Sequence, residues 1–164
     1  MKKNIFSKLL LFVMIGGLVI SCDEGGEPEA GATSTVEMSG DWFVQTFVGD
    51  DLVLDYQQIS TYNTAADDGT QMWVDDHGHI WDFKVKSPIN LDALTFSGET
   101  LSSNVDGYEV SVTITNGVIE KNGTTSTGGT TVDKISFDAE FSDDAGTIYS
   151  MIGYKRTGFP EDEH

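Results

Sequence analysis

Between residues 36 and 159, hydrophobic and polar residues alternate with a period of two, which is typical of strands with one buried face. The clearest run is Tyr108-Glu-Val-Ser-Val-Thr-Ile114, whose hydrophobic residues all fall on one side. Similar alternation occurs at 52–57, 81–86, 135–141 and 148–154, and more weakly at 71–75, 89–96 and 118–121. No stretch after Cys22 has convincing helical periodicity, apart from a short turn near 61–66. The pattern predicts an all-β domain.

Turn-forming residues separate these runs. Glycine, aspartate and asparagine gather at 49–51, 67–69, 77–78, 104–107 and 143–146, and Ser87-Pro88 marks a further turn. Asn116-Gly117 and Asn122-Gly123 indicate hairpins, because both residue types tolerate positive φ. The low-complexity stretch 124–131 is expected to be a loop. The count is roughly eight to nine short strands joined by tight turns.

Neighbouring antiparallel strands joined in this way must protect the edges of their sheet. Closure into a single antiparallel up-and-down β-barrel of about eight strands protects both edges fully. A sandwich of two sheets is the alternative. The barrel is the favoured prediction for residues 38–164.

The first 21 residues predict a signal peptide. Lys2, Lys3 and Lys8 form a basic start, and the apolar run 9–20 is shorter than the roughly 20 residues that span a bilayer. The run ends in Val19-Ile20-Ser21-Cys22, which resembles the bacterial lipobox. This resemblance implies cleavage before Cys22 and acylation of that residue, with each buried CH₂ contributing about 0.8 kcal/mol to membrane anchoring. A plain signal peptide with a chance cysteine is the alternative.

Residues 22–37 are predicted to be the acylated cysteine and a flexible acidic tether. The stretch 23–35 contains acids, glycine, proline and small polar residues but no large apolar side chain. An acidic stretch after a lipidated cysteine also resembles the export signal of surface lipoproteins in some Gram-negative bacteria, and a spacer that faces the periplasm is the alternative. We therefore expect a protein anchored to the outer membrane, on its periplasmic face or at the cell surface.

The charge balance excludes nucleic acid as a partner. The chain has 27 Asp and Glu against nine Lys and Arg, a formal net charge of −18. Three of the nine cations precede Cys22 and every acid follows it, so an exported product would be still more acidic. Such a surface repels phosphate backbones. The single cysteine also excludes an internal disulfide framework and any zinc cluster built on cysteines.

The two ends of the domain carry a resemblance to known proteins. Gly40-Asp41-Trp42 opens the first predicted strand, and Tyr154-Lys155-Arg156-Thr157-Gly158 ends the last. This resembles the calycin and lipocalin pattern, in which a basic side chain from the last strand stacks on the first tryptophan. Arg156 shares the parity of Ile152 and Tyr154 and is expected to point inward. Trp42 and Arg156 would then close one end of the barrel through a cation–π contact of about 0.5–2 kcal/mol.

With the lipobox and the acidic tether, these ends are similar to the bacterial lipoproteins of the lipid-binding putative hydrolase family. The resemblance covers nearly all of the chain after Cys22, although it is specific to individual residues only at the two ends. It implies a calycin-like barrel that binds a small apolar ligand. It implies no catalytic residue that can be carried over to this sequence.

Candidate catalytic and metal-binding residues are few. The histidines are His77, His79 and His164, and no Gly-x-Ser-x-Gly motif occurs. A Ser-His-Asp arrangement depends on geometry that spacing does not reveal. Asp75, His77 and His79 alternate and include donors that suit Zn²⁺, Ni²⁺ or Mn²⁺, but a polar hairpin end explains them more simply.

The aspartate pairs 50–51, 67–68 and 143–144 lack the frame of an EF-hand calcium loop, and turn solubility accounts for them better. We therefore predict no metal, no cofactor and no catalytic residue.

The aromatic residues favour a binding module. An eight-stranded barrel is just wide enough either to be filled by side chains or to hold one small ligand. We expect a small apolar or amphipathic, lipid-like molecule inside the barrel. The residues predicted to line its site are Leu54, Tyr56, Trp81, Phe83, Val110, Val112, Phe137 and Tyr154.

Two other functions remain open. The first is a non-catalytic envelope scaffold, whose filled barrel would bind a protein partner through its acidic surface or the 124–131 loop. The second is a hydrolase of short acyl esters that depends on His77 or His79.

Overall fold

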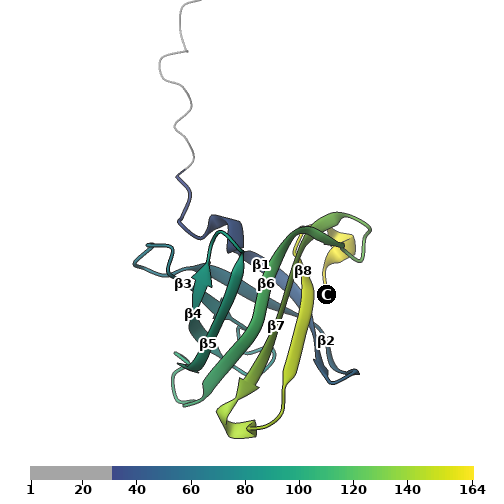
Figure 1. The fold of residues 1–164 in the computed structure, drawn as a ribbon. Helices are drawn as coiled ribbons and strands as arrows, with labels where there is room; N and C mark the ends of the chain where they lie inside the picture. Colours follow the sequence, from purple (N-terminus) through teal and green to yellow (C-terminus); the bar gives the residue numbers. More distant parts are fainter. Residues whose placement is uncertain (1–30) are drawn as a thin grey trace, which may run out of the picture. The chain divides into compact units, whose positions relative to one another are not determined.

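Eight antiparallel strands close into one barrel in the computed structural model, which describes residues 31–164 (Figure 1). Each strand pairs with its neighbour in sequence, and β1 pairs with β8 to close the ring. The strands are β1 (Gly40–Val48), β2 (Asp51–Asn63), β3 (Gln71–Asp75), β4 (Lys84–Asn90), β5 (Thr95–Ser102), β6 (Ser111–Thr125), β7 (Thr131–Phe141) and β8 (Tyr149–Lys155). The predicted all-β, up-and-down barrel is confirmed, and the sandwich is excluded.

Three short 3₁₀ helices complete the described chain: η1 (Val36–Met38), η2 (Ser142–Asp144) and η3 (Pro160–Asp162). The barrel unit begins at Ala32, and Ser34 already bonds to it through Asp67 Oδ1. Within residues 31–164, no helix is both long enough and apolar enough to cross a bilayer. The predicted signal peptide, Cys22 and the first part of the predicted tether lie outside the described residues.

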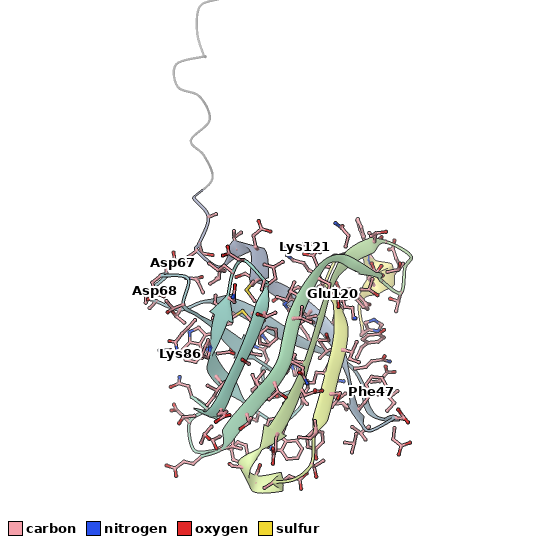
Figure 2. The ribbon with its side chains drawn as sticks, viewed as in Figure 1. Phe47, Asp67, Asp68, Lys86, Glu120 and Lys121 are labelled. Carbon is pink, nitrogen blue, oxygen red and sulfur yellow. The ribbon has the colours of Figure 1, made fainter. Side chains whose placement is uncertain are left out.

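Side chains fill most of the barrel interior. The inward faces of the strands carry apolar residues that are at most 4% exposed, and charged side chains such as Asp67, Asp68 and Lys86 project from the outer surface (Figure 2). A void wide enough for water would expose the atoms around it, so the interior next to these side chains is packed. The core residues are Met38, Trp42, Val44, Ile59, Met72, Val74, Phe83, Val85, Phe96, Val110, Val112, Ile114, Ile119, Ile135, Phe137, Ala139, Phe141 and Met151.

The two Asn-Gly pairs are bulges inside one strand, so the hairpins predicted there are wrong. Both pairs lie within β6, where the register with β7 shifts between Thr115 and Val118 and again between Glu120 and Thr124. Asn116 and Asn122 have φ values of 54° and 52°. Tolerance of positive φ suits a β-bulge as well as a turn, so the local sequence does not separate the two.

Ser87-Pro88 is also not a turn, because both residues lie within β4. The other predicted turns fall at the junctions between strands, and the predicted loop at 124–131 joins β6 to β7.

Bulges in β2 interrupt the alternation of its inward-facing and outward-facing residues. Along β1, Val44 and Thr46 pair with Gln57 and Leu54, so β2 uses one residue more than its partner. Leu54 therefore faces inward with Thr46, while Tyr56 packs with residues of the outer wall. A strict period of two would have placed both on one side.

The seam between β1 and β8 requires a glycine at position 153. A Cβ atom there would lie 1.9 Å from the Phe43 carbonyl oxygen and 2.6 Å from Val44 Cα. These atoms belong to the backbone of β1, which cannot move without breaking its pairing with β8. Gly153 thus allows the first and last strands to approach closely enough to close the ring.

We expect Gly153→Ala to lower the free energy of unfolding by about 1–3 kcal/mol, the range for overpacking a well-packed site. Chemical denaturation followed by tryptophan fluorescence measures this change. Gly31→Ala is the matched control, because its added Cβ meets no heavy atom of the described chain within 4 Å. Equal stability of the two variants would contradict a tight seam.

Candidate functional site

A row of polar side chains crosses the outer wall of four adjacent strands. The register pairs Asp41 of β1 with Ser60 of β2, Ser60 with Asp75 of β3, and Asp75 with Lys84 of β4. Inward-facing residues such as Trp42 and Val74 precede or follow them in sequence, so the row faces outward. It lines a groove of about 740 Å³.

Ser60 and His77 form the closest side-chain pair in this groove. His77 Nε2 lies 2.7 Å from Ser60 Oγ, and Ser60 Oγ donates to Asp41 Oδ1 at 2.6 Å. On the other side of the imidazole, His77 Nδ1 lies 3.5 Å from Asp75 Oδ1. Ser60 and Asp75 are 7% and 8% exposed, whereas the His77 side chain is 40% exposed at the opening. A serine, a histidine and an aspartate therefore follow one another across the groove.

Asp75 is held as a carboxylate by several donors. Tyr62 Oη donates to Asp75 Oδ2 at 2.7 Å, the His77 backbone N–H donates to Oδ1 at 3.0 Å, and Lys84 Nζ lies 3.1 Å from Oδ2. Burial by itself would raise the pKa of Asp75, but these hydrogen bonds and the charge of His77 together lower it below the ordinary value. Asp75 therefore stays ionised beside the imidazole at neutral pH.

The loop that carries His77 is built around a buried carboxylate. Asp76 is fully buried and accepts backbone N–H groups at both oxygens. Oδ1 accepts from Gly78 and Phe83 at 3.0 and 2.8 Å. Oδ2 accepts from Ile80, Trp81 and Asp82 at 3.1, 2.7 and 2.9 Å.

His77 itself has a φ of 53°, a region that costs energy for residues other than glycine. The Asp76 hydrogen bonds surround this position and hold the histidine in a conformation that it would not otherwise favour. His77 is thus fixed by its backbone, although its ring is partly exposed.

Besides the carboxylates of Asp41 and Asp75, the groove contains two lysines and apolar surface. Lys84 and Lys155 line it, together with Val36 of η1, which is 47% exposed. Lys84 Nζ lies 5.4 Å from the centre of the Tyr62 ring. In a chain with so few cations, two lysines beside an exposed apolar side chain suit an amphipathic ligand with a polar or anionic head.

Of the residues predicted to line an internal site, Phe83, Val110, Val112 and Phe137 belong to the packed core. Leu54 also faces inward but is only half-buried, opposite Thr46. Thr46 Oγ1 is buried and lacks a hydrogen-bond partner among the described residues.

Trp81 lies apart from these residues, in the loop between β3 and β4. Its ring stacks on Phe141 with centroids 4.5 Å apart, and its Nε1 donates to Asp143 Oδ1 at 3.1 Å. Tyr149 also contacts the Trp81 ring, at 4.9 Å. The indole therefore packs among aromatic side chains of the β7–β8 end of the barrel.

Tyr56 and Tyr154 lie on the outer wall, beneath the end of the chain. Their rings are 5.4 Å apart, and His164 stacks on Tyr56 at 4.3 Å. Tyr154 Oη lies 2.6 Å from His164 Nε2. The eight predicted lining residues thus do not share one surface, and their role in ligand binding stays a prediction.

Lys155, rather than the predicted Arg156, lies over the Trp42 ring. The Lys155 Nζ lies 5.7 Å from the ring centre, while Arg156 lies over Phe43 at 5.9 Å and pairs with Glu163. The prediction took the parity of Ile152 and Tyr154 as inward, but Ile152 is 43% exposed and Tyr154 packs outside. The residues of β8 that face inward are Met151 and Gly153, and Lys155 continues their parity at the last position of the strand, where it lies over Trp42 and also lines the groove.

No group of three metal-ligating side chains that could hold an ion occurs within residues 31–164. His79 Nδ1 lies 3.1 Å from the Gln58 carbonyl oxygen, and its ring centre is 6.0 Å from that of His77.

No pattern in the sequence marks Ser60, Asp41 or Lys155 as part of a site. Ser60 is 17 residues from His77, and only the register of β2 with β3 brings them together. Alternation along 58–62 could have predicted that Ser60 faces outward, but nothing local indicates its partners.

A family model described as "Lipid-binding putative hydrolase" matches residues 27–160, a range that includes all eight strands. No curated protein matches the chain.

We expect Asp76→Asn to lower the free energy of unfolding by about 3 kcal/mol, because the amide NH₂ would face backbone N–H donors that then lose their acceptor. Thermal and chemical denaturation measure the change. Asp82→Asn is the matched control in the same loop, since Asp82 is exposed and asparagine tolerates its φ of 59°. A loss no larger than that of the control would show that the Asp76 carboxylate does not hold the loop.

Proposed function

Because the chain belongs to the lipid-binding putative hydrolase family, we propose that it binds a small apolar or amphipathic, lipid-like molecule while anchored to a membrane. The outer groove supports this function best. The packed interior leaves little room beside the core residues, whereas the groove is open and offers both apolar surface and positive charge. The observation that carries the proposal is the combination of Val36, Lys84 and Lys155 along one groove.

In this proposal the polar head of the ligand lies near Lys155, and the acyl chain lies along Val36 and the Tyr62 ring. Lys155 forms no ion pair among the described residues, so its charge remains available for a ligand. Apolar burial would contribute about 25 cal/mol per Å² before the costs of association are subtracted. An anionic head would then be attracted to Lys155, since Lys84 is already paired with Asp75.

The proposed attachment of the protein to a membrane depends on Cys22. We propose that acylation of Cys22 holds the protein at the outer membrane, on its periplasmic face or at the cell surface, with the sequence Val19-Ile20-Ser21-Cys22 as support. A lipid anchor would keep the groove close to a source of lipid-like ligands.

The packed interior also suits the alternative of an envelope scaffold that binds a protein partner. Failure to load any lipid, together with co-purification of one stoichiometric partner, would favour that function.

Residues 23–164, produced without the signal segment, should bind a photoactivatable C16 fatty acid. We expect crosslinks at 33–41, 60–62 and Lys155, and about tenfold weaker binding for Lys155→Gln, equivalent to about 1.4 kcal/mol. Native mass spectrometry and peptide mapping measure both. Lys134→Gln is the control, because Lys134 pairs with Glu120 away from the groove. Crosslinks at Val112 or Phe137 instead would show that the ligand binds inside the barrel. Absence of any fatty-acid binding would contradict the proposed function.

Cys22→Ala should abolish fatty-acid labelling, because the proposed acyl chains attach to Cys22. The variant should then either appear in the soluble fraction or keep its uncleaved signal segment. Fractionation and metabolic labelling with a tagged fatty acid measure this outcome. Thr33→Ala, which leaves the cysteine in place, should stay labelled and membrane-bound. Fatty-acid labelling that persists in Cys22→Ala would exclude the anchor.

A further inference from the structure

We propose that the groove hydrolyses acyl esters, with Ser60 as the nucleophile, His77 as the general base and Asp75 as the residue that positions the imidazole. The proposal rests on the proposed function in one respect, since the substrate is an ester of the lipid-like class that the groove would bind. It adds a chemical step that binding alone does not require.

The geometry meets the first requirement of this chemistry, which is a nucleophile and a base within hydrogen-bond reach. Ser60 Oγ and His77 Nε2 are 2.7 Å apart. Asp75 Oδ1 faces the other ring nitrogen at 3.5 Å, a distance within the looser range of sites without substrate. The three side chains therefore occupy the relative positions of a nucleophile, a base and an orienting carboxylate.

The Ser60 hydroxyl has two partners and one proton. In the resting arrangement it donates to Asp41 Oδ1 at 2.6 Å and accepts from His77 Nε2; when the ring proton lies on Nδ1 instead, a rotation about the C–O bond directs the hydroxyl proton to Nε2. Asp41 thus holds the hydroxyl in place between turnovers. Asp75, ionised beside the ring, favours the form of His77 that carries its proton on Nδ1 and leaves Nε2 free to accept.

The reaction then balances without any cofactor. Ser60 Oγ attacks the ester carbonyl carbon while its proton passes to His77 Nε2. The tetrahedral intermediate collapses, the C–O bond to the alcohol breaks, and His77 returns the proton to the departing alkoxide. Water attacks the acyl-serine, gives its proton to His77, and Ser60 leaves with that proton, so that ester and water become acid and alcohol.

The charge that develops on the carbonyl oxygen would face lysines. Lys84 and Lys155 line the same groove as Ser60, and positive groups aimed at a developing oxyanion lower its energy. Lys84 already neutralises Asp75 at 3.1 Å, so Lys155 is the cation available to this oxygen. The groove therefore contains a nucleophile, a base, an orienting carboxylate and a lysine without an ion-pair partner among the described residues.

The test uses the full chain in detergent micelles with p-nitrophenyl butyrate and p-nitrophenyl palmitate as substrates. We expect steady ester hydrolysis, reduced at least 100-fold by Ser60→Ala and by His77→Gln. A fluorophosphonate probe should label Ser60, and peptide mass spectrometry would identify the site. Asp75→Asn should lower kcat with little change in KM and slow the labelling of Ser60, which a purely structural role would not do.

Two controls match these variants. Ser150 donates to Asp138 Oδ1 at 2.6 Å with no histidine beside it, and His79 lies in the same loop as His77. Ser150→Ala and His79→Gln should therefore keep full activity. If Ser60→Ala folds poorly, Ser60→Cys replaces it in the test. This variant retains a nucleophile of similar size, and we expect it to keep measurable acylation.

Hydrolysis that survives Ser60→Ala, or a folded protein that neither turns over esters nor labels at Ser60, would overturn the proposal. Fatty-acid binding by Ser60→Ala separates the two ideas, since bound lipid without hydrolysis leaves the binding function standing. If the unaltered protein binds no fatty acid, the proposed lipid-binding function is wrong. Turnover of p-nitrophenyl butyrate with labelling of Ser60 would still support the proposed catalytic site in that case.

Discussion

The pairing of β1 with β8, from Trp42–Lys155 to Val48–Tyr149, removes the two free edges that an eight-stranded sheet would otherwise expose. It depends on close backbone contact at Gly153 and places Lys155 over the buried Trp42 ring. Trp42 Nε1 also donates to Thr61 Oγ1, which in turn donates to the Met38 carbonyl. The pairing of β1 with β8 thus both closes the ring and fixes the position of Lys155 in the groove.

The distribution of side chains assigns different roles to the two faces of the sheet. The inner face is apolar and packed, so it supplies stability through burial. The outer face carries polar side chains, and on four strands these form a continuous row with small exposure at Ser60 and Asp75. Because eight strands enclose little volume, a polar site on the outside of the wall does not compete with the core for space.

The fold was predictable because period-two alternation survives in most strands, and an up-and-down meander has few ways to hide its edges. Register was not. Bulges at Asn116 and Asn122 look like turns in the sequence, and bulges in β2 separate Leu54 from Tyr56. The family was recognisable from the ends of the domain. Which basic residue, Lys155 or Arg156, lies over the Trp42 ring depends on which residues of β8 face inward, and the sequence did not show this. Ser60 and His77 meet only through pairing between strands, which no local pattern encodes.

The polar row draws one residue from each of β1, β2, β3 and β4, so no single hairpin contains it. A slip of two residues between any adjacent pair would keep every side chain on its correct face yet separate the row by about 7 Å at that joint. A folding intermediate with native-like strands and a native-like core could therefore still lack the groove. The presence of this surface therefore reports on the correct alignment of β1 to β4 more strictly than compactness does.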